Sequence, residues 1–198
     1  QDYKKLRQNV VMGFCLTCLG GEGKHSFVPD RNEGSYVNYL LKDLFQTNKI
    51  NFKKYSWLDR GSDERQFCSP LVNIPFATIF KTKFGEYEEY HTSLDNKKFL
   101  NFSDLKESLK LINNLVKKIE KKRFPIQKFP CEPFLTKYKL HNPINFKNNS
   151  FNRDILNVLS FCDGKNDIEI ISKNCRIKLG QTKKIILKLS KLKILKFI

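Results

Sequence analysis

The sequence predicts an α/β sheet domain followed by a smaller, mainly helical module. In residues 1–124, apolar β-branched runs alternate with segments of helical periodicity, as expected when strands and helices alternate. A proline-rich stretch without clear periodicity follows over residues 125–150 and predicts a surface linker. From residue 151 to 198 the pattern changes to short amphipathic segments and a terminal apolar run, an order typical of a winged-helix module.

The first half of the sheet domain is expected to hold a strand, a loop and a helix. Residues 9–19, NVVMGFCLTCL, are apolar with almost no charge, which is typical of a strand buried in the centre of a sheet. GGEGKHSFVPDRNEG follows as a loop rich in breaking residues. A helix is predicted from Ser35, its N-cap, with an apolar face made of Val37, Leu40, Leu41, Leu44 and Phe45.

Two more strands and a long helix complete the domain. INFKKYSW and VNIPFATIFKT have strand character, and LDRGSDERQFCSP between them reads as a long irregular loop. Because ligand sites in open α/β sheets lie at the carboxyl ends of strands, the loops that follow strands are candidates for function. A helix is expected over about 103–123, capped by Ser103, with one apolar stripe made of Leu105, Leu109, Ile112, Val116 and Ile119.

The positive charge is concentrated in the second half of the chain. The net charge is +17, but residues 1–96 carry only +1, and 30 of the 37 cations are lysines. Base reading and phosphate clamping favour arginine's two-pronged guanidinium, so the lysine excess argues against nucleic acid as a partner. No apolar run of about 18 residues predicts a membrane span, and the N-terminus lacks a secretory signal, so the expected location is cytoplasmic.

The cysteines and two of the three histidines are expected to be structural. A chain with a real core needs no disulfide framework, so the six cysteines are predicted to be reduced thiols. The pair in CLTC, Cys15 and Cys18, lies inside the first predicted strand, where residues three apart face opposite sides. Cys68 has no base partner in its QFCSP segment. His25 and His141 lie in polar, loop-like segments and are expected to be surface residues.

The third histidine has different neighbours. Residues 86–96 read EYEEYHTSLDN, with Tyr90 before His91 and Asp95 four residues later. A metal-binding histidine needs its ring oriented by other groups, often carboxylates, and a phenol can donate a hydrogen bond to a developing oxyanion. The residues alone leave a functional role and an ordinary loop histidine equally open.

This segment resembles the last metal-ligand segment of the zinc aminopeptidase family that includes bacterial leucyl aminopeptidases and glutaminyl cyclases. Ser62-Asp63, followed by Phe67, is similar to that family's Ser-Asp-His loop beside the substrate, with Glu64 in place of the histidine. Together, GSDERQFCSP, EYHTSLDN and CEPFL resemble bacterial aminopeptidase-like proteins with a C-terminal winged helix, often associated with polysaccharide biosynthesis. The resemblance covers nearly the whole chain.

The resemblance implies the C-terminal part of a zinc aminopeptidase-like (phosphorylase/hydrolase-like) α/β domain over residues 1–124, and a winged-helix domain over residues 151–198. Such a hydrolase cleaves amide or peptide bonds at the amino terminus of a peptide or aminoacyl substrate. The roles implied are His91 as metal ligand, Tyr90 as oxyanion donor, Asp95 as the carboxylate that orients the ligand, and Asp63 and Glu64 as substrate-binding residues.

The resemblance also implies that the site is incomplete. In that family the other ligands, a His and an Asp, and the general-base Glu precede the strand that begins here near Asn9. Where many relatives carry a further metal-binding Asp, this sequence has Thr17 or Cys18, which favours one zinc ion over two. The missing N-terminal part of the same protein is therefore an expected partner, and the 198 residues alone are expected to be inactive.

Two other classes of function stay open, a non-catalytic aminopeptidase-like scaffold and a nucleic-acid- or protein-binding winged helix. The last predicted helix carries lysines that could face a DNA groove, but its apolar residues suit packing against a neighbour. The lysines are Lys178, Lys183, Lys184 and Lys188, and the apolar residues are Ile185, Ile186, Leu187 and Leu189.

Overall fold

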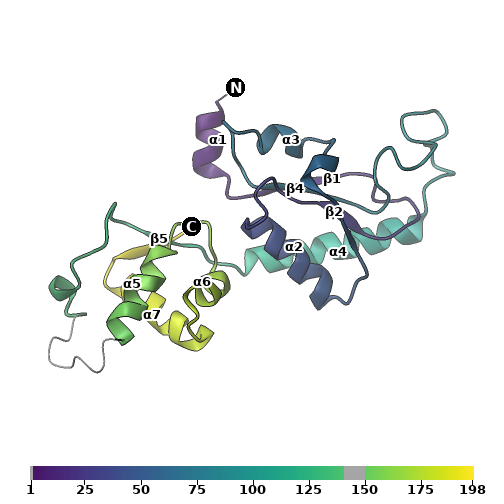
Figure 1. The fold of residues 1–198 in the computed structure, drawn as a ribbon. Helices are drawn as coiled ribbons and strands as arrows, with labels where there is room; N and C mark the ends of the chain where they lie inside the picture. The colour runs from purple at the N-terminus through teal and green to yellow at the C-terminus, as the bar shows by residue number, and fades with distance from the viewer. Residues whose placement is uncertain (1, 141–149) are drawn as a thin grey trace. The chain divides into compact units, whose positions relative to one another are not determined.

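The computed structural model describes residues 2–140 and 150–198, and the chain divides into two units (Figure 1). Unit 1 comprises Gln1–Glu120 and unit 2 comprises Lys121–Ile198. The predicted surface position of His141 lies outside the described residues. The α/β class with a helical C-terminal unit is confirmed.

Unit 1 is built on a four-stranded mixed sheet with the order β1-β4-β2-β3. β1 runs parallel to β4, β2 runs antiparallel to β4, and β3 runs parallel to β2. The strands are β1 Gly13–Leu16, β2 Ser26–Val28, β3 Lys53–Lys54 and β4 Phe76–Phe80. Gly13 lies opposite Phe76, and a Cβ at Gly13 would stand within 2.5 Å of the Phe76 ring, so any other residue there would displace this ring.

Two helices pack side by side against this sheet, α2 (Tyr36–Thr47) and α4 (Phe102–Glu120) (Figure 1). The predicted apolar face of α2 is confirmed, because all five of its residues are buried. Its Phe45 ring stacks on Phe27 of β2 and on Phe52, with centroids 5.9 and 4.7 Å apart. The shorter helices are α1 Tyr3–Asn9, α3 Glu64–Phe67 and a 3₁₀ turn at Trp57–Asp59.

Three predictions for unit 1 are wrong in informative ways. β1 is not a central strand, since it spans four residues, is half-buried and lies at the end of the strand order. β2 lies inside the segment expected to be a loop, because three residues are too few to show an alternation. α4 begins one residue earlier than expected and is capped by Asn101, whose Oδ1 accepts from the amides of Ser103 and Asp104.

The buried face of α4 also differs from the predicted stripe. Ser108, Leu111 and Leu115 are buried, whereas Leu105, Leu109 and Val116 of the predicted stripe are exposed. The periodicity correctly identified the helix but not the side on which unit 1 covers it.

The described residues of unit 2 form three α-helices, a 3₁₀ turn at Leu135–Tyr138 and a two-stranded antiparallel sheet. The helices are α5 Ser150–Ser160, α6 Ile168–Cys175 and α7 Leu179–Lys191, and the strands are β5 Pro125–Gln127 and β6 Leu195–Phe197. β5 lies in the segment expected to be a linker, yet it pairs with β6 of the terminal module. The core is apolar and includes Ile155, Val158, Ile171, Ile185 and Leu189. No helix among residues 2–140 and 150–198 is long and apolar enough to span a bilayer.

Candidate functional site

A pocket of about 530 Å³ lies in unit 1 where β1 and β4 end. One wall is the loop after β1, and the other is the segment that runs from the end of β4 to the start of α4. The position agrees with the expectation that loops at the carboxyl ends of parallel strands carry the site. The lining residues are Thr17, Cys18, Leu19, Gly20, Gly21, Thr82, Tyr87, Tyr90, His91, Asp95, Phe99, Leu100 and Leu105.

His91 is held in this pocket by its backbone and by a neighbouring ring. Its φ is +60°, in the left-handed region, and its imidazole stacks on Tyr90 with centroids 3.9 Å apart and planes 17° apart. Tyr90 in turn packs edge-on to Tyr87 at 5.5 Å, and Tyr87 stacks on Phe99 at 5.2 Å. This tier of rings fixes the plane of the exposed imidazole without burying it.

The hydroxyl of Tyr87 links the two walls of the pocket. It lies 3.4 Å from Cys18 Sγ and 3.3 Å from Asp95 Oδ2. A phenol has one hydrogen and can donate to only one of these acceptors at a time. Burial, the contact with Cys18 and the nearby Asp95 carboxylate all raise the pKa of Tyr87, so the phenol stays protonated and remains a donor at neutral pH.

Cys18 differs from its sequence-based interpretation as a strand residue. β1 ends at Leu16, and Cys18 follows it with φ +47° and its thiol at the pocket. Cys15 remains in the strand, and its Sγ lies 3.0 Å from Ser62 Oγ. The two thiols therefore contact different groups, and only that of Cys18 lies at the pocket.

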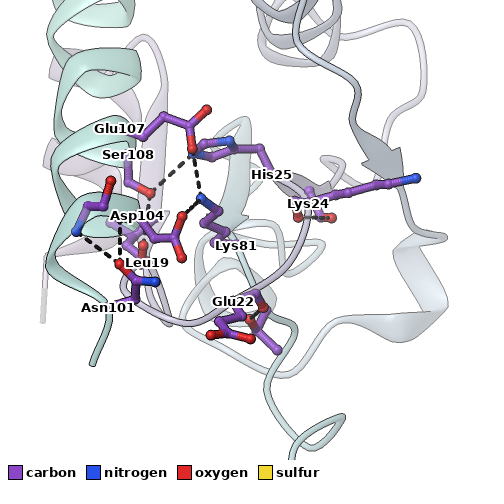
Figure 2. A network of polar contacts seen from close by, with 12 residues as sticks. Leu19, Glu22, Lys24, His25, Lys81, Asn101, Asp104, Glu107 and Ser108 are labelled. Carbon is purple, nitrogen blue, oxygen red and sulfur yellow. Dashed lines mark hydrogen bonds and ion pairs between the residues drawn. The ribbon is translucent and has the colours of Figure 1, made fainter. Parts of the chain in front are cut away.

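A buried polar network anchors the loop after β1 to α4 (Figure 2). Ser108 Oγ donates to the Leu19 carbonyl at 2.8 Å, and His25 Nε2 lies 3.1 Å from the same hydroxyl. Because the single Ser108 hydrogen is directed to Leu19, His25 must donate through Nε2–H. The backbone amide of Asn101 donates to the Gly20 carbonyl at 2.9 Å. These bonds hold the Leu19 and Gly20 peptide groups, which belong to the pocket lining, against the N-terminal part of α4.

His25 is buried, so its predicted surface position is wrong. It is 2% exposed, and it directly precedes β2, the strand that the sequence analysis missed. Burial lowers the pKa of His25 from its ordinary value of 6.5, and nearby charges have smaller effects: Glu107 and Asp104 raise the pKa and Lys81 lowers it. The neutral ring is the form that fits its single donated hydrogen bond.

Lys81 carries the charge of the same network. Its ammonium lies 2.5 Å from Asp104 and 2.7 Å from Glu107, and its side chain is buried at the end of β4 (Figure 2). Burial opposes the charge of Lys81, but the hydrogen bonds to both carboxylates outweigh it and raise the lysine pKa. This ion triad ties the end of β4 to the first turns of α4.

Asp63 and Glu64 do not line the pocket. Glu64 is fully buried: Oε1 accepts from the amides of Gly61 and Ser62, at 2.8 and 3.1 Å, and Oε2 accepts from Thr78 Oγ1 at 2.5 Å. Asp63 is exposed at the start of α3. The structure therefore gives Glu64 a role in the fold of its loop, and contact of either carboxylate with a substrate stays a prediction.

Tyr90, His91 and Asp95 are the predicted site residues that the structure brings together. Asp95 is joined to Tyr87 by the bond already described, and its action on the imidazole stays a prediction. Tyr87 also lines the pocket and was not among the predicted site residues, although it lies in the same EYEEY segment. In the described ranges 2–140 and 150–198, no group of three His, Cys, Asp or Glu side chains could hold a metal ion.

Comparisons with known proteins place the chain in a family. The profile of a family described as "Domain of unknown function (DUF4910)" matches residues 1–122, more than half of the chain. The chain belongs to the DUF4910 family. A winged helix-turn-helix profile matches residues 125–197 of this DUF4910 chain, which confirms the winged helix predicted for its C-terminal end.

Two matches to this DUF4910 chain come from Clostridium acetobutylicum. One, named "Putative polysaccharide biosynthesis protein with aminopeptidase-like domain", is 28% identical over 166 residues, 81% of this chain and 38% of the relative. The other is a crystal structure described as a "putative peptidase", with 24% identity and a TM-score of 0.59 over 98% of this chain and 44% of the relative. That likeness shows a shared fold. In both matches the DUF4910 chain spans less than half the length of the matched protein.

Proposed function

We propose that this chain forms one part of the active site of an aminopeptidase-like hydrolase that cleaves an amide or peptide bond at an amino terminus. The observation that carries the proposal is the convergence of Tyr90, His91 and Cys18 on one pocket at the ends of β1 and β4. The name of the Clostridium relative, a polysaccharide biosynthesis protein with an aminopeptidase-like domain, supports both the reaction class and a link to polysaccharide biosynthesis.

The chain's own residues supply recognition and electrostatic groups. The hydroxyl of Tyr90 can donate to the oxyanion that forms when water attacks the scissile carbonyl. Tyr87, which is protonated at neutral pH, offers a second phenol within the pocket. The apolar lining of Phe99, Leu100 and Leu105 excludes water and accepts an apolar part of the substrate.

Zinc is the metal that the resemblance implies, and this chain alone does not fit a zinc site. Zinc sites in proteins use three or four protein ligands, whereas no such group exists within the described residues. His91 is the ligand that we assign to this chain, since its imidazole is exposed and its plane is fixed by Tyr90. The remaining ligands belong to the region that the relatives have beyond the matched part, and a single ion is proposed.

The test begins with the purified 198 residues and a series of aminoacyl anilides, with zinc added. We expect no turnover from this chain alone. Turnover that appears in the wild type and disappears in His91→Ala would show a complete site within the chain and overturn the proposal of missing ligands.

The second part of the test uses the protein extended by the region that the relatives carry. Here His91→Ala should remove most of the bound zinc, measured by elemental analysis, while circular dichroism shows an unchanged fold. Tyr90→Phe is the matched variant, because it keeps the stacked ring and should keep the zinc, but should lower kcat by about 10² to 10³. A folded, zinc-loaded protein without any turnover would favour the non-catalytic scaffold.

A further inference from the structure

The pocket of unit 1 differs in charge from the rest of the chain. The chain has a net charge of +17, yet none of the described residues that line the pocket is a lysine or an arginine. Asp95 is the one carboxylate among these lining residues. A pocket with one carboxylate and no permanent cation favours a positively charged ligand over a negatively charged one.

The two lysines that flank the pocket residue Thr82 have partners elsewhere. Lys81 is buried and forms the ion triad with the two carboxylates of α4. The ammonium of Lys83 lies 3.7 Å from Glu86 and stands 5.1 Å from the centre of the Tyr55 ring. Neither lysine lines the pocket, so neither neutralises the carboxylate within it.

The carboxylate of Asp95 is oriented but keeps room for a ligand. Its Oδ2 lies 3.3 Å from the Tyr87 hydroxyl, which donates to it. Across residues 2–140 and 150–198, no lysine, arginine or histidine forms an ion pair with Asp95. Because an ionised carboxylate accepts several hydrogen bonds, Asp95 can accept from a ligand while it keeps the contact with Tyr87.

Aromatic rings line the same pocket as this carboxylate. Tyr87 packs edge-on to Tyr90 at 5.5 Å and stacks on Phe99 at 5.2 Å, and all three residues belong to the lining. The face of an aromatic ring attracts cations, organic ammonium groups among them. The lining therefore combines two kinds of group that recognise a protonated amine, a carboxylate and aromatic rings.

The other carboxylates predicted to bind the substrate are less suited to an amine. Glu64 is fully buried, and both of its oxygens accept hydrogen bonds from the protein. Asp63 does not line the pocket. Asp95 itself is expected to orient His91, but among the described residues its carboxylate is hydrogen-bonded to Tyr87 and not to that imidazole.

We propose that Asp95, held in place by Tyr87, binds the protonated α-amine of the substrate. This inference rests on the proposed function and deepens it, because an enzyme that acts at an amino terminus must distinguish a free amine from an internal amide. The substrate class is an amide with a primary ammonium group next to the scissile carbonyl. Substrates with an acylated or negatively charged amino terminus are excluded.

The first test measures binding to the 198-residue chain by NMR, without hydrolysis. The probes are leucinamide and 4-methylpentanamide, which differ only in the α-amine, a group that is charged at about pH 6.5. Leucinamide should bind about tenfold more tightly, as judged from the amide signals of residues 17–21 and 87–95. Asp95→Asn should remove this preference. Glu88→Gln makes the same change of charge at an exposed position outside the pocket and should preserve it.

The second test separates binding of the amine from orientation of His91. In the protein extended by the region that the relatives carry, Asp95→Asn should raise KM for a leucyl anilide by about tenfold, with kcat and bound zinc unchanged. A carboxylate that orients a metal ligand would give the opposite pattern, with less bound zinc, a lower kcat and an unchanged KM.

Two results would overturn the proposal. One is that the two probes shift the signals of the wild-type chain equally, or not at all. The other is that Asp95→Asn loses zinc while KM stays the same. Failure of the hydrolase proposal looks different: the extended protein would cleave no anilide, while the wild-type chain would still prefer leucinamide and Asp95→Asn would not, which would retain the ammonium site.

Discussion

Glu64 has a fully buried carboxylate that receives hydrogen bonds from two amides and the Thr78 hydroxyl. Glu64→Ala would leave these three buried donors without an acceptor. We expect the free energy of unfolding of unit 1 to fall by about 3 kcal/mol. Urea denaturation followed by the fluorescence of Trp57 measures it, because this single tryptophan lies in unit 1.

The matched variant for this measurement is Glu64→Gln. It keeps one carbonyl acceptor for the two amides and nearly the same volume, so it should cost about 1 kcal/mol. If Glu64→Ala unfolded at the same urea concentration as the wild type, the carboxylate would not hold the loop of residues 61–64.

His25 should make the stability of unit 1 depend on pH. Burial lowers its pKa in the folded state, so the unfolded state binds the proton first as pH falls. The free energy of unfolding should therefore decrease as pH falls below about 6.5, by at most about 1.4 kcal/mol per pH unit for this one group. Lys81, Asp104 and Glu107 surround the ring, and the lowered pKa of Glu107 adds a further loss only below 4.5.

His25→Gln separates protonation from packing. A glutamine amide can donate to Ser108 as Nε2–H does, but it does not titrate in this range. The variant should fold and should show a flatter stability profile between about pH 7.5 and 5.5 in the Trp57 assay. An unchanged slope would assign the pH dependence to other groups.

At the scale of elements, DNA is a testable partner for the α7 helix of the winged helix-turn-helix unit. Its exposed side carries Lys183, Lys184 and Lys188 beside Leu187, and the helix contains no arginine. Lysines attract phosphates without reading bases. We expect weak DNA binding without sequence preference, with a Kd of about 10⁻⁴ to 10⁻⁶ M at physiological salt.

Fluorescence anisotropy with labelled duplexes of unrelated sequence, over a salt series, measures this binding. Lys183→Gln with Lys184→Gln should reduce the salt slope by about 2, whereas Lys106→Gln with Lys110→Gln in α4 should not. Tight binding to one defined duplex at physiological salt would show sequence readout and contradict the prediction.

An element was predictable from the sequence where its pattern of apolar residues alone determines both its type and its buried face. The α2 helix was predicted with its face, because its five apolar residues all pack within unit 1. For α4, the apolar periodicity predicted the helix. Which side of the helix is buried depends on the neighbouring elements, and no local pattern encodes these. β2 has three residues, too few to show an alternation of apolar and polar side chains, so the strand was not predicted. His25, which directly precedes it, was therefore expected at the surface.

At the scale of the whole molecule, the two units have separate cores. The core of unit 2 is drawn from residues between Leu135 and Leu195. We expect residues 121–198, expressed alone, to keep their helical circular dichroism and to melt in one cooperative transition. A broad, non-cooperative melt would show that unit 2 depends on unit 1 for its fold.

The site was predictable where its residues are neighbours in sequence. Tyr90, His91 and Asp95 come from one loop, and the structure gathers them in one pocket. Cys18 and the network of Lys81 and His25 are brought to the site by the pairing of β1, β4 and β2. The sequence contains no local signal for that pairing.

The strand order has a consequence for synthesis on the ribosome. β4 lies between β1 and β2, although it is the last strand of this sheet to be translated. Until residue 80 has left the exit tunnel, β1 cannot pair with β4, and of the pairs in this sheet only the short β2–β3 pair can form. Nascent chains that stall earlier expose an uncharged, apolar segment for as long as the pause lasts, and such segments are what chaperones bind. Translation speed across residues 17–80 should therefore affect the yield of folded protein more than translation speed after residue 80.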